Sequence, residues 1–338
     1  MTLVHHPRYH AHRQTVGHPE CPERLDAIVA RLKREGLWND VLKPEPVDPA
    51  LLRKVHTPEY IESIRDFGEG YMDPDTYVRP ETYEIALLAA GGAVLAARTA
   101  LERGTPSFAL VRPPGHHAGS YHGGGFCYFN NAAIATEAAL EKVRRVAIVD
   151  IDLHHGNGSS DIFYKRDDVL YISTHQGGIY PGTGIPEELG EGRGMGYNLN
   201  IPLPGGSGDA TYNLALRRII KPVLQSYRPE LILVSLGGDA HYMDPLGGMA
   251  LTSPGYVAIS EELLALASSL CGGAIAFTLE GGYHTGALAE LVAGIVASFD
   301  GKKVQYEFDR SSDETGTGAY AVARAAAAMR RHWPSIEG

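Results

Sequence analysis

Cysteine is scarce in this sequence, and no two cysteines form a C-x-x-C pair. The 338 residues include three cysteines, Cys21, Cys127 and Cys271, which lie far apart along the chain. An odd number of well-separated thiols excludes a zinc site built from thiolates and gives no sign of a disulfide framework. This pattern fits a reduced protein, so we expect a cytoplasmic location.

Long apolar runs and an excess of basic residues are also lacking. No segment reaches the roughly 18 consecutive apolar residues that a membrane span needs, and residues 1–10 contain no apolar signal-peptide core. The formal net charge is -10, which argues against a surface that binds nucleic acid. We therefore expect neither a membrane nor a nucleic acid as a direct partner.

Several common catalytic motifs are absent as well. The sequence has no G-x-x-x-x-G-K-[ST], no H-E-x-x-H and no G-x-S-x-G, and no G-x-G-x-x-G opens a helix. Histidines are frequent near the N-terminus, but their spacing matches no ligand pattern. Most of these are expected to be structural: His5, His6, His10, His12 and His18.

Short apolar runs alternate with segments of helical pattern. The runs are 108–111, 146–151, 169–174, 231–236 and 274–279, and the helical segments are 84–104, 130–142, 211–227 and 254–270. Continuous apolar strands between helices predict an α/β fold, with a central parallel sheet and helices on both faces. Without a repeat or linker, residues 1–338 are predicted to form a single domain. The C-terminal extension, about 301–338, is expected to hold a loop over 305–318 and a surface helix over 318–333.

Polar side chains gather where the predicted strands end, which is where open α/β sheets bind their ligands. Each strand end taken alone has the alternative of an ordinary polar loop, but several of them carry compatible groups. The candidates are His116, His117, Asp150, Asp152, His154, Asn157, Asp239 and Tyr283.

A metal site is predicted from three of these residues. Asp152 and His154 are two positions apart, so both side chains point the same way on an extended segment. A pair of this kind by itself is more often a solvated loop or a structural hydrogen bond. Asp239 supplies a third ligand from another strand end, and two carboxylates with one imidazole fit a catalytic zinc or a similar divalent ion.

His116 and His117 are the candidates for proton transfer, because imidazole gains and loses a proton near pH 7. Asp150 and Asn157 can hold the far nitrogens of the two rings, and the histidine beside the charged Asp150 should keep its proton more readily. Tyr283, which follows two glycines, is suited to donate a hydrogen bond to an oxyanion. A packing tyrosine is the alternative.

Seven motifs in order resemble those of the zinc-dependent histone deacetylase family, which in its broad sense includes bacterial and archaeal deacetylase-like proteins and acetylpolyamine amidohydrolases. The resemblance extends from residue 17 to about 299, and Asn157 and the LEGGY form are similar to class II members. The motifs are 112-RPPGHHA-118, 124-GGFCYFNNAAIA-135, 149-VDIDLHHGNG-158, 181-PGTG-184, 198-NLNIPLP-204, 235-SLGGDAH-241 and 279-LEGGYH-284.

This resemblance implies an arginase/deacetylase-type fold and a role for each matching residue. Zn²⁺, or Fe²⁺ in the cell, would bind Asp152, His154 and Asp239. His117 would be the general base and acid beside His116, and Tyr283 would stabilise the transition state. The implied substrate-binding residues are Gly125, Phe126, Tyr180, Leu246, Asp75 and Arg24, with Arg24 in an inner cavity below the metal. Structural K⁺ would use Asp150, Asp152, His154, Ser173 and Thr174, and a second K⁺ would lie near Phe163, Arg166, Val169 and Tyr197.

Some positions depart from the family pattern. Tyr180 stands where phenylalanine is frequent, and Gly238 replaces the usual phenylalanine before Asp239. Leu246 falls where polyamine-specific relatives can carry an acidic residue, which disfavours a polyamine substrate. Asp75 is the candidate for a carboxylate at the rim, although its alignment is shifted by about one residue.

The predicted activity is hydrolysis of an N-acyl lysine or amine by metal-activated water. Acetylpolyamines and other small amides are the alternative substrates, and a homo-oligomer is left open. A ureohydrolase with two manganese ions would need further carboxylates at the positions of Gly156 and Gly237. An inactive module that binds an acyl ligand is the remaining alternative, against which the complete set of ligands and Tyr283 argue.

Overall fold

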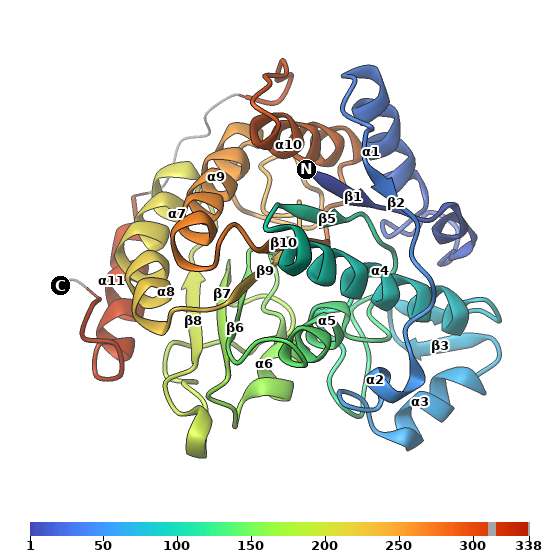
Figure 1. Cartoon of the computed structure of the whole chain (residues 1–338), viewed down its shortest axis with the longest axis horizontal. Helices are drawn as coiled ribbons and strands as arrows, with labels where there is room; N and C mark the ends of the chain where they lie inside the picture. Colours follow the sequence, from blue (N-terminus) through green and yellow to red (C-terminus); the bar gives the residue numbers. More distant parts are fainter. Residues whose placement is uncertain (310–315, 337–338) are drawn as a thin grey trace.

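The computed structural model describes residues 1–309 and 316–336 and shows an α/β fold around one large sheet (Figure 1). The sheet has eight strands in the order β2-β1-β5-β10-β9-β6-β7-β8, and all neighbouring strands are parallel. This confirms the predicted fold class. The strands are β1 (Thr2–Val4), β2 (Val41–Leu42), β5 (Ser107–Ala109), β6 (Val146–Asp150), β7 (Val169–Gln176), β8 (Asn198–Leu203), β9 (Leu231–Leu236) and β10 (Ile275–Leu279).

The helices divide between the two faces of the sheet because crossovers between parallel strands are right-handed. The chain crosses the sheet in one direction from β5 through α5 to β6, and in the other direction from β9 through α9 to β10. One face is therefore covered by α4 (Thr82–Arg103), α5 (Asn131–Leu140) and α6 (Asn157–Phe163). The other carries α1 (Glu23–Arg34), α7 (Asp209–Ala215), α8 (Lys221–Tyr227), α9 (Ser253–Leu270) and α10 (Thr285–Phe299) (Figure 1).

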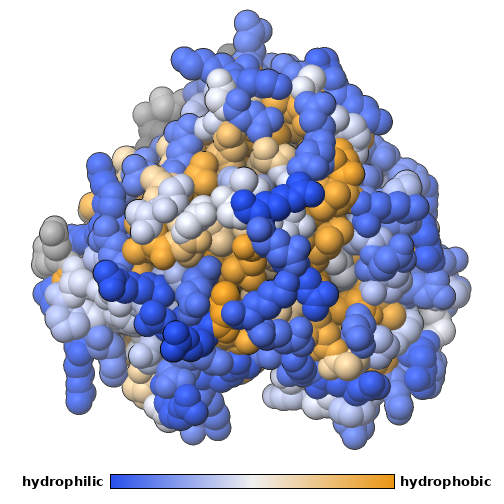
Figure 2. All heavy atoms as spheres, viewed as in Figure 1, coloured by the Kyte–Doolittle hydropathy of each residue, from blue (hydrophilic) through white to orange (hydrophobic). Residues whose placement is uncertain are grey.

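Smaller elements complete the fold outside the main sheet. The helices α2 (Pro49–Leu52) and α3 (Pro58–Arg65) precede a separate antiparallel hairpin of β3 (Gly70–Asp73) and β4 (Thr76–Val78). The helix α4 is long and apolar enough to cross a membrane, but 72% of its apolar window is buried. Burial of this kind is expected of a core helix. Figure 2 shows hydrophilic residues around the rim of one face of the molecule, with apolar areas between them.

The structure corrects the sequence-based prediction of one helix and of several strands. The helix predicted over 211–227 is divided into α7 and α8 by a π-helical segment, Leu216–Ile220. Pro222 lies just after this segment and has no amide N–H for the regular helical ladder. The strands β1, β2 and β8 were not predicted, because two of them are very short and β8 contains Pro202, which is tolerated at the edge of a sheet.

The C-terminal helix α11 (Gly318–Met329) is a surface helix that packs one side against β8 and α7. It ends before the predicted boundary at 333 and buries Val322, Ala325, Ala326 and Met329. After it, the indole Nε1–H of Trp333 donates to the carbonyl oxygen of Gly196 at 2.6 Å, and the ring lies edge-on to Tyr197 and Tyr227. The loop predicted over 305–318 includes residues outside the described part of the chain.

Replacing Trp333 with alanine is expected to lower the free energy of unfolding by about 2–3 kcal/mol, because it removes an aromatic cluster and a hydrogen bond. Urea denaturation of the purified variant would measure the change. The matched control is Tyr320→Ala on α11, where the side chain is 78% exposed, and a change within about 0.5 kcal/mol is expected. Equal destabilisation by both substitutions would contradict the anchoring role of Trp333.

Candidate active site

The carboxyl ends of the central strands meet at one edge of the sheet, and the predicted site residues gather there. Asp152 and His154 follow β6, Asp239 follows β9 and Tyr283 follows β10. Next to them lies a cavity of about 410 Å³. Its lining residues are His18, Pro19, Asp75, Pro114, His116, His117, Gly125, Phe126, His154, Tyr180, Leu246, Gly281 and Tyr283.

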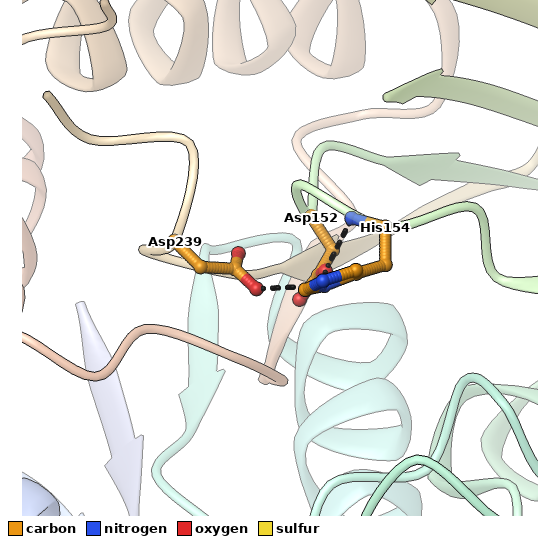
Figure 3. A group of neighbouring side chains, drawn as sticks. All are labelled: Asp152, His154 and Asp239. Carbon is orange, nitrogen blue, oxygen red and sulfur yellow. Dashed lines mark hydrogen bonds and ion pairs between the residues drawn. The ribbon is translucent and has the colours of Figure 1, made fainter. Parts of the chain in front are cut away.

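Asp152, His154 and Asp239 form a cluster at the strand ends whose candidate ligand atoms lie within 4.8 Å of one another. Figure 3 shows the three side chains pointing toward a common centre, and the Nδ1 of His154 lies 3.1 Å from Asp239 Oδ2 and 3.3 Å from Asp152 Oδ1. Both carboxylates are fully buried. Buried carboxylates need a positive charge nearby, so this donor set fits a divalent cation.

The protonation equilibria of the cluster reflect this demand for positive charge. Burial together with the Asp152 carboxylate raises the pKa of Asp239 to about 7. Burial opposes protonation of His154, but the hydrogen-bonded carboxylates of Asp152 and Asp239 outweigh it and raise the pKa of His154 to about 10. Both shifts have the same physical cause, which is the negative charge that two buried carboxylates place at this point.

Glycines near the cluster stand at positions where a side chain would meet the neighbouring carboxylates. A Cβ at Gly237 would lie 2.6 Å from Asp239 Oδ1 and would overlap Asp152, and a Cβ at Gly281 would lie 2.8 Å from Asp152 Oδ2. At Gly156, a Cβ would overlap the carboxylate of Asp150. The extra ligands of a two-manganese ureohydrolase site therefore have no room at Gly156 and Gly237.

The two histidines contact the partners that the sequence suggested. His116 Nδ1 lies 3.1 Å from Asp150 Oδ2, and His117 Nδ1 lies 2.8 Å from Asn157 Oδ1. Burial opposes the charge on His116, but the carboxylates of Asp152 and Asp150 raise its pKa to about 10. Burial and the neighbouring His116 and His154 hold the pKa of His117 well below its usual value. His117 is therefore neutral, and its contact with a carbonyl oxygen places the proton on Nδ1 and leaves Nε2 as an acceptor.

Two residues that support these histidines were missed from the sequence. The hydroxyl of Tyr171 donates to Asp150 Oδ2 at 3.0 Å, and Glu280 Oε2 accepts the backbone N–H groups of Gly115 and His116 at 2.7 and 3.2 Å. Glu280 stands inside the 279-LEGGYH-284 motif, so its position was a usable signal. Tyr171 had no comparable signal, because its proximity to Asp150 depends on the pairing of β6 with β7.

Tyr283 lies at the cavity, with its ring 5.7 Å from that of Phe126. Burial and the Asp239 carboxylate raise its pKa well above the usual value, so its hydroxyl remains a hydrogen-bond donor. Arg24, predicted to lie in an inner cavity below the metal, is in the described chain not among the residues that line this cavity, and its role in substrate binding stays a prediction. Its guanidinium is fully buried behind Tyr283 and donates to the carbonyl oxygens of Gly282 and Glu280.

The remaining predicted substrate-binding residues line the cavity, together with a histidine that was not predicted to lie there. Gly125, Phe126, Tyr180, Leu246 and Asp75 all face it. The unexpected member is His18, which was assigned with the other N-terminal histidines to a structural role. Its Nε2 lies 3.0 Å from the carbonyl oxygen of Asp75, and its ring packs edge-on to Phe126.

Asp73 lies beside the predicted rim carboxylate Asp75 and contacts the backbone of the rim. Its Oδ2 accepts the N–H of Gly125 at 3.1 Å, and its Oδ1 accepts the N–H of Asp75 at 3.0 Å. Two acidic residues thus stand near the rim: Asp73 holds the turn that carries Phe126, whereas Asp75 is exposed and faces the cavity.

The residues predicted to bind K⁺ lie in two places. Ser173 and Thr174 are buried in β7, where Thr174 Oγ1 donates to the carbonyl oxygen of Asp150 at 3.4 Å. Arg166 forms an ion pair with Asp168 at 2.7 Å and packs over the ring of Phe163 at 5.4 Å. These contacts do not test for a bound ion, so both potassium sites stay predictions.

Comparisons with known proteins agree with the motifs. The profile of the histone deacetylase domain matches residues 18–299. The chain is 43% identical over 308 residues to a probable deacetylase of Archaeoglobus fulgidus, covering 88% of this chain and 86% of that protein. It is 42% identical over 277 residues to a histone deacetylase-like amidohydrolase of Pseudomonas aeruginosa, covering 79% and 73%.

The fold gives the same result. The crystal structure of the HDA15 HD domain superimposes with a TM-score of 0.91 and 34% sequence identity, covering 99% of this chain and 98% of that one. The match extends over the sheet, the helices and the strand ends that carry the site. The chain therefore belongs to the histone deacetylase family and is a hydrolase of amide bonds.

Proposed function

We propose that this chain is a zinc-dependent amidohydrolase that removes an acetyl or other acyl group from an N-acylated lysine. One observation carries the proposal: the buried cluster of Asp152, His154 and Asp239 lies beside the cavity that His117 and Tyr283 line. Two carboxylates and one imidazole match the ligand chemistry of a catalytic Zn²⁺, and Fe²⁺ is the alternative ion.

The side chains around the cluster have separate roles in the proposed reaction. The ion, when bound, supplies a Lewis acid that polarises the amide carbonyl and activates water. His117 accepts a proton of the attacking water at Nε2, because the hydrogen bond to Asn157 keeps the proton of the neutral imidazole on Nδ1. Tyr283 donates its hydroxyl proton in a hydrogen bond to the developing oxyanion. The proton taken by His117 then passes to the leaving amine.

The walls of the cavity favour an acyl-lysine over an acylated polyamine. Phe126 and Tyr180 are aromatic residues that suit an aliphatic chain. A second ammonium group of a polyamine would need a carboxylate near Leu246, which is apolar and 41% exposed. Acetylpolyamines therefore remain the second candidate substrate.

A panel of acyl-lysine peptides and acylated amines, tested with metal-free and metal-loaded protein, would check this function. We expect turnover of acetyl-lysine peptides with Zn²⁺ or Fe²⁺, loss of turnover with a chelator and recovery after the ion is added back. The released acetate and amine should form in equal amounts. Turnover that a chelator leaves unchanged would refute the metal-dependent mechanism, and turnover of acetylpolyamines alone would favour the second candidate.

A further inference from the structure

The loop that carries Tyr283 has little intrinsic rigidity. Gly281 and Gly282 precede the tyrosine, and Gly282 has φ +111°, a conformation that L side chains rarely adopt. A Cβ at Gly282 would also lie 2.8 Å from Gly238 Cα. Glycine is therefore required here, but its conformational freedom means that other groups must fix the direction of the following residue.

Two buried charged side chains hold the peptide group between Gly282 and Tyr283 from opposite sides. The Nε–H of Arg24 donates to the carbonyl oxygen of Gly282 at 2.6 Å. The N–H of Tyr283, which belongs to the same peptide group, donates to Asp244 Oδ2 at 2.6 Å. Arg24 is fully buried and Asp244 is 7% exposed, so water competes little for either hydrogen bond.

Each side chain makes further contacts that fix its own position. The Arg24 guanidinium also lies 5.0 Å from the centre of the Tyr283 ring and pairs with Glu20 at 3.3 Å. Asp244 Oδ2 accepts the N–H of His284 at 3.2 Å as well, and its Oδ1 accepts the N–H of Leu246 at 3.0 Å. Asp244 therefore joins the loop that carries the metal ligand Asp239 to the loop that carries Tyr283.

We propose that Asp244, opposite Arg24, is a positioning residue that fixes the Gly282–Tyr283 peptide and so directs the Tyr283 hydroxyl toward the reacting carbonyl. This inference rests on the proposed function, because it assigns Asp244 to the step in which Tyr283 acts. The carboxylate touches backbone N–H groups of the loop, and its effect on the reaction passes through the tyrosine.

Kinetics of Asp244→Ala should show the role. We expect kcat to fall about 100-fold, since a displacement of about 1 Å costs that much, with KM nearly unchanged. Asp244→Asn keeps one acceptor oxygen and should lose less activity. If the alanine variant folds poorly, the kinetics of the asparagine variant test the inference in its place. The matched control is Asp209→Ala, which removes hydrogen bonds to Thr252 outside the cavity and should leave kcat close to wild type. A wild-type kcat in Asp244→Ala would overturn the inference.

A double-mutant comparison separates positioning from general damage to the fold. In the Tyr283→Phe background, where the hydroxyl is gone, Asp244→Ala should cause little further loss in single-turnover experiments, because residues that act as a unit are not additive. Leu246→Ala keeps the backbone N–H that Asp244 accepts and removes only a side chain at the cavity, so it should change KM more than kcat. The same further loss in both backgrounds would overturn the role through Tyr283.

A readout that does not depend on turnover distinguishes this inference from the proposed function. In a crystal structure of zinc-loaded Asp244→Ala, the Gly282–Tyr283 peptide should be rotated and the Tyr283 ring displaced, with zinc still bound to its three ligands. An unchanged peptide and ring would overturn the inference even if the wild type is active. Absence of wild-type turnover on every acyl substrate would instead refute the proposed function.

Discussion

His117→Ala is expected to lower kcat for an acetyl-lysine peptide by about 10³-fold, within the range found for general acid–base catalysis. The structure gives the reason: His117 is the neutral imidazole at the cavity, with its proton held on Nδ1 by Asn157 at 2.8 Å. Its removal leaves the attacking water without a base. Zinc content should stay at one ion per chain, because His117 is outside the cluster of Asp152, His154 and Asp239.

Steady-state kinetics on zinc-loaded protein would measure this loss, with metal analysis of the same samples. His116→Ala is the informative comparison, because His116 pairs with Asp150 and is expected to tune the local charge rather than accept the proton. A smaller loss in His116→Ala than in His117→Ala would support this division. Turnover of His117→Ala at the wild-type rate would refute the assignment.

Tyr283→Phe is expected to lower kcat by about 10²–10³-fold, which is typical for the loss of one oxyanion donor. The substitution removes the hydroxyl and keeps the ring, so the packing against Phe126 and Arg24 should persist. KM and zinc content should therefore change little. A thermal unfolding curve close to that of the wild type would confirm that the loss comes from the hydroxyl.

Steady-state kinetics on zinc-loaded Tyr283→Phe would measure this loss. Tyr128→Phe is a suitable control, because it removes the hydroxyl of another buried tyrosine, one that donates to the carbonyl oxygen of Tyr77 and not to the reaction. We expect the control to affect stability more than kcat. If Tyr283→Phe retained wild-type turnover, another donor would have to stabilise the oxyanion.

Most of the fold could be predicted from local patterns. The buried strands β6, β7, β9 and β10 are continuous apolar runs, and α4, α5 and α9 have the expected length and composition. The strands β1, β2 and β8 were missed because β1 and β2 are too short to carry a periodic signal and β8 contains Pro202. The π-helical turn before Pro222 is also a local feature, but its exact form depends on how α7 and α8 pack.

Some of the site residues could likewise be predicted from local patterns, and others could not. Asp152, His154 and Asp239 could be proposed because strand ends in parallel sheets meet at one edge. The position of His18 at the cavity and the contacts of Arg24 could not be predicted. The direction of His18 depends on its contact with Asp75, and that of Arg24 on carbonyl oxygens more than 250 positions further along the chain.

The sequence by itself therefore determined the α/β class and the residue types of the candidate metal cluster, and it supplied the candidates for proton transfer. These follow from residue types and from spacing within short segments, where the backbone geometry is nearly constant. Only the tertiary structure decided three contacts. Glu280 accepts the backbone N–H of His116, Arg24 donates to the carbonyl oxygen of Gly282, and Asp244 accepts the N–H of Tyr283. Such contacts join segments that the order of the strands brings together, and no local pattern encodes that order.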